Sequence, residues 1–325
     1  MVKIEWFDLE SDIVKEYLDK TTQFISEKYK QLDENDLPND LKKAVFTNVE
    51  TFLKSPRRKL LEDEFFSKYI KNIIEFPESY TEYNDKLKSV FGYEIIHKDN
   101  LRHKLLASLK VDCCPYCNRQ YITSWKNSDT EEKTTADLDH FYPQNQFPLF
   151  ALSLFNFVPS CQVCNSRMKH NKFIDCLYPY EESFGDDAVF RISSIHDNTE
   201  KSDKYYERLL YAFQGRENSE FSIIIENLAI DSELHQRIEN SKKLFKLEEV
   251  YQAHQEYVRE LFIKQRIYDE GAYLEMLNKQ FSKHRLVFGD TDLKAFLYGF
   301  RWDDAGHHTR PLSKLTYDLI KQNLK

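Results

Sequence analysis

Glycine is scarce in this chain, and several recognition motifs are absent with it. Only 7 of the 325 residues are glycine, which excludes a glycine-rich phosphate-binding loop and a dinucleotide-binding fingerprint. No stretch approaches the roughly 18 to 20 apolar residues that cross a bilayer, and the N-terminus lacks a charged start followed by an apolar run. Internal repeats and low-complexity linkers are also missing. We therefore expect a soluble cytoplasmic enzyme or a subunit of a complex.

Acidic side chains are missing from one stretch of an otherwise acidic protein. The net charge is −8, yet residues 100–172 carry nine Lys or Arg against six Asp or Glu. No acidic residue occurs between Asp139 and Asp175. A local positive excess is typical of a phosphate-binding surface, although a buried apolar segment at 147–158 would explain the same gap. The basic residues that we expect to contact nucleic acid are Arg167, Lys169, His170 and Lys172.

Apolar spacing and proline positions divide the chain into three parts. The composition, 41% hydrophobic and 14% aromatic, supports substantial cores. Residues 1–109 have helical apolar spacing and predict an all-helical N-terminal domain. Residues 110–185 change to short segments punctuated by proline. Residues 186–325 return to helical spacing and predict a mostly helical C-terminal domain, which is a candidate docking region for a partner.

Within these parts the pattern predicts particular strands and helices. Residues 121–125 have the β-branched and aromatic content of a strand, 126–134 indicate a hairpin loop, and 136–141 indicate the returning strand. Residues 221–225 fit either a strand or a buried helical turn. Residues 232–278 predict one or two long amphipathic helices.

Two cysteine pairs at metal-ligand spacing are the strongest chemical signal in the sequence. Two residues separate Cys114 from Cys117, and two separate Cys161 from Cys164. Four thiolates in two such pairs are the ligand set of a closed tetrahedral zinc site, which pins two loops together. Six cysteines with this usage suit a reducing compartment, and the other two, Cys113 and Cys176, receive no role.

The first cysteine pair also has a redox interpretation. Cys114-Pro115-Tyr116-Cys117 has the form of a thiol oxidoreductase centre, in which a thiolate of low pKa attacks disulfides. That chemistry usually occurs in a βαβ context. Here a second cysteine pair follows downstream and the preceding segment has helical spacing, so zinc binding is favoured.

Polar residues between and after the cysteine pairs indicate a hydrolytic site. Asp139 and His140 are adjacent, so on a strand their side chains would point to opposite faces. Asp139 could then bind a metal while His140 faces a water molecule, or the strand end could twist enough for both side chains to reach one phosphate. Asn156 and Asn165 supply amide groups that can orient an imidazole or ligate a metal. A short helix at 162–170 would direct its N-terminal dipole toward a phosphate. Oxygen ligands of this kind suit Mg²⁺ or Mn²⁺.

Each of these residues also has a purely structural interpretation. His140 could be a hydrogen-bonded core histidine, Asn156 could cap a turn, and Asn165 could cap the short helix. The adjacent histidines His307 and His308 lie in a polar stretch, where such residues are usually solvent-exposed.

The central pattern resembles the ββα-metal nucleases called HNH endonucleases. His140 matches the first motif residue and Asn156 the central asparagine, while Asn165 stands where a final histidine often stands, which gives an H-N-N variant. The resemblance implies that His140 is the general base and that Asn156 orients it. It also implies that Asp139 and Asn165 hold a catalytic Mg²⁺ or Mn²⁺, and that the four paired cysteines bind a structural zinc.

Longer stretches resemble the HNH proteins that are encoded beside ATPases in bacterial anti-phage systems of the Septu type. The similarity covers 138–143, 147–153 and 164–169, and the late segment 308–315 is also similar, without an assigned role. It implies an α+β, mostly α fold with a small zinc-stapled HNH core between helical domains. It further implies DNA hydrolysis in a complex with an ABC-type or SMC-like ATPase.

Two alternatives to DNA cleavage stay open. A ββα-metal site contacts mainly the nucleic-acid backbone, so the substrate could be RNA, for example a tRNA. The chain could also be a non-catalytic module in which the zinc-stapled region binds nucleic acid or a partner protein.

Overall fold

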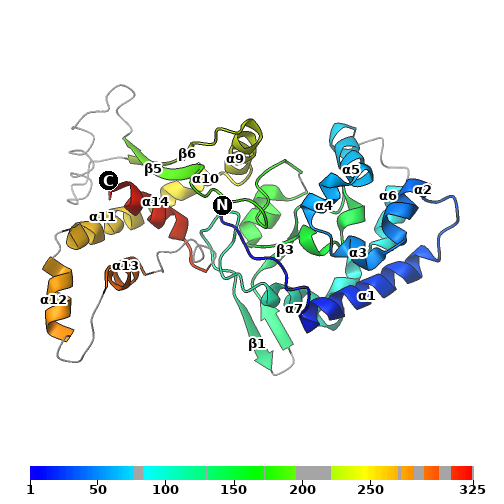
Figure 1. The fold of residues 1–325 in the computed structure, drawn as a ribbon, viewed down its shortest axis with the longest axis horizontal. Helices are drawn as coiled ribbons and strands as arrows, with labels where there is room; N and C mark the ends of the chain where they lie inside the picture. The colour runs from blue at the N-terminus through cyan, green and yellow to red at the C-terminus, as the bar shows by residue number, and fades with distance from the viewer. Residues whose placement is uncertain are drawn as a thin grey trace.

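Helices dominate the structure, and short strands lie in the centre and in the C-terminal part. Figure 1 shows helices on both sides of a central region that contains β3 (Asp137–His140). The computed structural model describes residues 1–76, 83–128, 131–171, 173–194, 221–269, 272–281, 289–299 and 309–323. Lys172 and His307 lie outside these described residues.

The first part of the chain is helical because apolar side chains recur there at helical spacing. In α1 (Asp12–Tyr29) the buried residues Val14, Tyr17 and Ile25 lie on one face. The Ser11 side chain caps this helix by accepting a hydrogen bond from the backbone N–H of Val14 at 3.4 Å. Further helices of this part are α2 (Asn39–Leu41), η1 (Lys42–Phe46), α3 (Val49–Leu53), α4 (Arg57–Glu62), α5 (Glu64–Glu75), α6 (Asn84–Val90), η2 (Tyr93–Asn100) and α7 (Leu101–Ser108).

The predicted hairpin forms, but it closes earlier than expected. β1 (Ser124–Ser128) pairs with β2 (Glu131–Thr134) in antiparallel fashion, so the predicted loop at 126–134 is largely strand. The predicted returning strand at 136–141 was assigned to the wrong partner. It contains β3, which does not pair with β1.

β3 pairs instead with β4 (Phe157–Ser160), whose four residues are all buried. Pairing with β3 satisfies the backbone polar groups of this apolar segment inside the protein. A short π-helical segment, η5 (Val163–Lys169), follows β4 and packs against β3. Two strands and a short helix are therefore adjacent here. Two 3₁₀ turns, η3 (Pro148–Phe150) and η4 (Leu154–Asn156), connect β3 to β4.

The C-terminal part combines a strand pair with a series of helices. β5 (Ala188–Ser194) pairs antiparallel with β6 (Phe221–Asn227), so the ambiguous segment 221–225 is a strand. The one or two long helices predicted across 232–278 are shorter, partly because Lys246 adopts a left-handed φ of 44° and interrupts them. The helices are α9 (Ser232–Leu244), α10 (Leu247–Tyr251), η6 (Gln252–His254), α11 (Gln255–Asp269), α12 (Ala272–Phe281), α13 (Asp290–Tyr298) and α14 (Ser313–Asn323).

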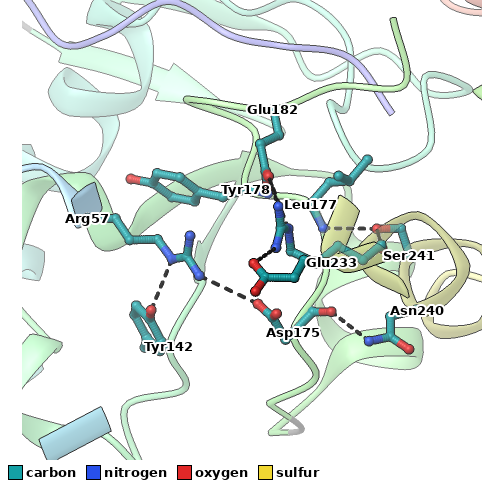
Figure 2. A network of polar contacts seen from close by, with 10 residues as sticks. Arg57, Tyr142, Asp175, Leu177, Tyr178, Glu182, Glu233, Asn240 and Ser241 are labelled. Carbon is teal, nitrogen blue, oxygen red and sulfur yellow. Dashed lines mark hydrogen bonds and ion pairs between the residues drawn. The ribbon is translucent and has the colours of Figure 1, made fainter. Parts of the chain in front are cut away.

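A segment that follows η5 connects the helical parts on both sides of the central region. From α4, Nη2 of Arg57 lies 3.5 Å from Oδ1 of Asp175. From α9, the amide of Asn240 donates to the backbone carbonyl of Asp175 at 2.7 Å, and Ser241 accepts from the backbone N–H of Leu177 at 3.0 Å. Figure 2 shows these contacts as one network around the segment.

Buried apolar side chains of all three parts pack into one continuous cluster. Burial of such side chains is the main favourable contribution to folding. Over the described ranges, no helix combines the length and the apolar character that crossing a membrane requires.

Candidate functional site

The four paired cysteines come together as predicted. Their sulfur atoms all lie within 4.8 Å of one another, and all four residues are buried. The Sγ atoms of Cys117 and Cys161 are 3.9 Å apart, close to the ~3.8 Å that tetrahedral Zn–S bonds of about 2.3 Å impose. A disulfide would need about 2 Å. The donor set therefore fits a tetrahedral zinc ion.

The environment of the cysteines opposes redox catalysis. Cys114 is 0% exposed, and burial raises the pKa of its thiol well above the usual value. A reactive cysteine needs the opposite, an accessible thiol of lowered pKa. Hydrogen bonds within the cluster, with Cys114 contributing most, lower the pKa of Cys161 instead. All four cysteines of the cluster are buried, so none of their thiols is presented to a disulfide substrate.

The turn that carries the first cysteine pair is held by the C-terminal part of the chain. The hydroxyl of Tyr251 donates to the backbone carbonyl of Cys117 at 2.7 Å. Asn118, at a left-handed φ of 49°, accepts from the backbone N–H of Leu312 at 2.6 Å through its carbonyl, and its amide donates to the carbonyl of Arg310 at 3.3 Å. The unassigned segment 310–315 thus docks the start of α14 on the turn of the first cysteine pair.

His140, at the end of β3, is held in one orientation. Its Nε2 lies 2.9 Å from the backbone carbonyl of Ala151, and since a carbonyl can only accept, Nε2 carries the proton. Nδ1 then has a free lone pair, and among the described residues it has no hydrogen-bond partner. The rings of Tyr93 and Phe157 pack edge-on against the imidazole, with centroids 4.9 and 5.3 Å away.

Burial keeps this imidazole neutral. His140 is 9% exposed, and loss of hydration lowers its pKa to about 4. At neutral pH the ring is therefore an uncharged proton acceptor, as a general base must be.

Asn156 organises the backbone that follows His140. Its Oδ1 accepts from the N–H of Tyr142 at 2.7 Å, and its Nδ2 donates to the carbonyls of Tyr142 and Phe150 at 3.1 and 3.0 Å. The expected contact with the imidazole is made by Ala151 instead. Asn156 thus acts on His140 through the loop between the two strands.

Asp139 lies beside His140 and is sealed from solvent. Oδ2 accepts a hydrogen bond from the hydroxyl of Tyr116 at 2.6 Å, and Oδ1 lies 3.0 Å from Nζ of Lys169. Burial and the Asp139 charge both raise the pKa of Tyr116, so the phenol stays a donor. Both carboxylate oxygens already have partners.

Asn165 engages a different carboxylate. Its amide donates to Oδ2 of Asp137 at 3.1 Å, and Ser166 donates to the same oxygen at 3.4 Å. Nη2 of Arg102 lies 3.6 Å from the other oxygen of Asp137. The expected pairing of Asp139 and Asn165 around one cation is not assembled, so the residues as placed do not fit a catalytic Mg²⁺ or Mn²⁺.

The predicted basic cluster divides between the surface and the interior. Arg167 and His170 are exposed. Lys169 is only 2% exposed and lies inside the protein rather than on the expected phosphate-binding surface, because its ammonium bonds to Asp139 and to the carbonyl of His140. Lys172 falls outside the described residues.

Sequence reasoning missed Arg57, which reaches the site from the N-terminal helices. Its Nε donates to the hydroxyl of Tyr142 at 3.0 Å, and its guanidinium carbon lies 5.5 and 5.6 Å from the ring centroids of Phe141 and Tyr178. Figure 2 shows Arg57 between Tyr142 and Asp175. Nothing near position 57 signals this role, because its partners are far away in sequence. Tyr116, in contrast, could have been noticed between two cysteines at metal-ligand spacing.

No protein-family model, no curated protein and no solved structure matches this chain. Function is therefore inferred from the side chains around His140 and the cysteine cluster.

Proposed function

We propose that this chain is an HNH-type endonuclease that hydrolyses phosphodiester bonds of DNA. The observation that carries the proposal is the state of His140: a neutral imidazole, fixed by Ala151 through Nε2, with Nδ1 free to accept a proton. It stands at the end of a strand that is followed by a second strand and a short helix. The cysteine cluster lies at the start of that helix, where the H-N-N resemblance implies a structural zinc.

The chemistry follows from the free lone pair of His140. Nδ1 takes a proton from a water molecule while the water oxygen attacks phosphorus. The bond from phosphorus to the 3′ oxygen breaks, and that oxygen takes a proton from solvent. Arg167 and His170 are exposed on and just after η5 and would help to hold the nucleic-acid backbone. Asn156 keeps the imidazole in place through the loop it binds.

The structural zinc is the staple of this proposed site. It joins the turn at Cys114 and Cys117 to the start of η5 at Cys161 and Cys164. A closed four-cysteine site contributes folding energy and leaves no open coordination position for chemistry. Its role is to hold the start of η5 against the turn of the first cysteine pair, whose Tyr116 bonds to Asp139 of β3.

The cellular role belongs to the same proposal. We infer a cytoplasmic effector of a bacterial anti-phage complex with an ABC-type or SMC-like ATPase, from the likeness of 138–143 and 164–169 to Septu-type proteins. With a net charge of −8, the chain would capture DNA slowly on its own. A partner that supplies positive charge would remedy this.

Cleavage of supercoiled DNA and of a structured RNA tests the proposal. The purified chain, alone and with its ATPase, is compared with the variants His140→Ala and His97→Ala, the second altering a histidine outside the site. We expect DNA nicking that His97→Ala retains and His140→Ala loses. Cleavage of the RNA without cleavage of the DNA would support the alternative that the substrate is RNA. Equal nicking by His140→Ala and the parent chain would refute the role of His140 as the general base.

One observation favours a non-catalytic binding module. Both oxygens of Asp139 are engaged by Tyr116 and Lys169, and His140 is only 9% exposed. A module of this kind would bind nucleic acid or protein without cleaving it. The same assay separates the two functions, because a module binds equally well with His140→Ala and cleaves nothing in any combination.

A further inference from the structure

The hairpin of β1 and β2 presents two aromatic side chains to solvent. Tyr121 is 58% exposed and Trp125 is 46% exposed, whereas Ile122 between them is 1% exposed. Side chains alternate between the two faces of an extended chain, so Tyr121, the exposed Thr123 and Trp125 lie on one face, which we call the aromatic face. Figure 1 shows the hairpin projecting from the central region. The aromatic face is therefore accessible to a partner.

The charges of the hairpin divide between its two faces. Trp125 lies directly opposite Lys133 in the strand register, so the indole and this lysine are neighbours on the aromatic face. On the opposite face, Lys126 and Glu132 are paired at 3.4 Å, which offsets the Glu132 charge. Among the side chains that the structure describes, the aromatic face thus combines rings, hydroxyl groups and a positive charge.

This combination suits a nucleic-acid strand better than a protein partner. The core of a protein interface is apolar and closely packed, but here a threonine separates the two rings. Bases of a single strand stack on individual aromatic rings, and nearby lysines attract the backbone phosphates. Four residues of extended chain span about 13 Å, so Tyr121 and Trp125 would receive different bases of one strand.

The hairpin is attached to both parts of the candidate site. At its base, Tyr121 forms a β-bridge with Cys113, and the backbone N–H of Cys114 donates to the carbonyl of Gln120 at 3.0 Å. At the end of β2, only two residues precede β3, and Nη2 of Arg102 donates to the carbonyl of one of them, Ala136, at 3.1 Å. A strand on the aromatic face would therefore be held on an element that leads directly into β3.

We propose that Tyr121 and Trp125 are a stacking site for the unpaired bases of a DNA strand. The inference rests on the proposed function, since a nuclease has to hold the strand that it cuts. It names the substrate class of the site as DNA with unpaired bases. Base pairs of an intact duplex keep their faces covered by their neighbours and cannot stack on these rings.

Binding of a fluorescein-labelled oligothymidine to the zinc-loaded full chain at low salt tests the proposal. The strand is about 15 nucleotides long, within the range that one stacking domain covers. The parent chain should bind it more tightly than a duplex of equal length or a strand of equal length with abasic sugars. Trp125→Ala and Tyr121→Ala should each weaken binding at least about fivefold, because each removes one stacked base.

Matched variants separate stacking from other effects. Trp125→Phe keeps an aromatic ring and should retain most of the affinity, whereas Trp125→Leu keeps apolar area without a ring and should lose it. Phe76→Ala removes an aromatic side chain of equal exposure, 58%, outside the hairpin, and should bind as the parent does. The strand should quench tryptophan fluorescence of the parent chain, and Trp125→Ala should lose that quenching. All variants should melt at the parent temperature, since the altered residues are exposed.

Equal affinity of the parent chain, Trp125→Ala and Tyr121→Ala overturns the proposal, as does equal affinity for the abasic strand or no binding by the parent chain. Variants that bind the strand normally but no longer assemble with the ATPase would assign the aromatic face to a protein and also overturn it. These outcomes are independent of cleavage. A chain whose strand binding needs Trp125 but that never cuts DNA would refute the proposed nuclease and keep the stacking site.

Discussion

The side chains of His140 and Asn156 are fixed by contacts with backbone groups rather than with other side chains. His140 is oriented by the carbonyl of Ala151, and Asn156 binds both backbone groups of Tyr142. Hydrogen bonds of this kind specify one conformation of the loop, because they satisfy buried backbone groups of Tyr142 and Phe150. A substitution at Asn156 therefore tests the loop without touching the imidazole.

Replacement of Asn156 by alanine should destabilise the protein by about 2–4 kcal/mol, because it leaves the buried N–H and carbonyl of Tyr142 without their side-chain partner and removes one of the two hydrogen bonds to the carbonyl of Phe150. Urea unfolding followed by circular dichroism measures the change. Gln31→Ala, at an exposed position, is the control and should stay within about 0.5 kcal/mol of the parent. A similar small effect of Asn156→Ala would show that the loop is held by other contacts.

Among the elements, α4 contributes an unexpected support to the site. Arg57 places a charged group among aromatic rings and donates to Tyr142, two residues after His140. Such a partly buried guanidinium stabilises through its ring contacts and its charged hydrogen bond together. The N-terminal helices therefore help to set the loop that carries the proposed base.

Arg57→Met should reduce the free energy of unfolding by about 2–4 kcal/mol, since the methionine keeps apolar volume but loses the charged hydrogen bond and the ring contacts. The neighbouring Arg58→Met is a matched control, because the Arg58 side chain is 81% exposed. The two variants are compared by urea unfolding. Equal stability of the two would mean that Arg57 contributes no more than a surface residue.

The clustering of the four paired cysteines was predictable from the sequence, and the surrounding contacts were not. The spacing within each cysteine pair is visible in the local sequence, so the four paired cysteines, Cys114, Cys117, Cys161 and Cys164, could be identified as one ligand set. β3 pairs with β4 because the two segments are neighbours in the folded chain. The local composition of residues 121–125 favoured that segment as the partner of β3, which was wrong. The docking of Leu312 on Asn118 joins residues nearly two hundred positions apart, which no local pattern encodes. The direction of Lys169 is likewise set by tertiary structure.

On the scale of the whole molecule, zinc should be required for the fold. The cysteine turns are in contact with α10 and with the start of α14, so loss of the ion should loosen the C-terminal part as well as the proposed site. We expect one zinc ion per chain by native mass spectrometry. Cys161→Ser should contain none and lose cooperative unfolding, whereas Cys176→Ala, a buried cysteine outside the cluster, should keep its zinc. A zinc-free parent chain that unfolds cooperatively would contradict this.

Buried tyrosines should make the whole protein sensitive to alkali. Burial raises the pKa of Tyr93 to about 12 and that of Tyr17, Tyr178 and Tyr180 well above the usual value. The unfolded chain loses these protons near pH 10 while the folded protein retains them, so stability falls as the pH rises above about 10. Tyrosinate absorbance and circular dichroism should change together in an alkaline titration. Full ionisation near pH 10 with an intact helical spectrum would disprove the burial effect.

The most direct test of the account is the rate of DNA nicking by the parent chain and by His140→Ala, both zinc-loaded and of equal thermal stability. A positioned general base accounts for about 10² to 10⁴ in rate. We therefore predict at least a hundredfold loss in His140→Ala and none in His97→Ala. Equal rates for His140→Ala and the parent chain would contradict the assignment of His140 as the base.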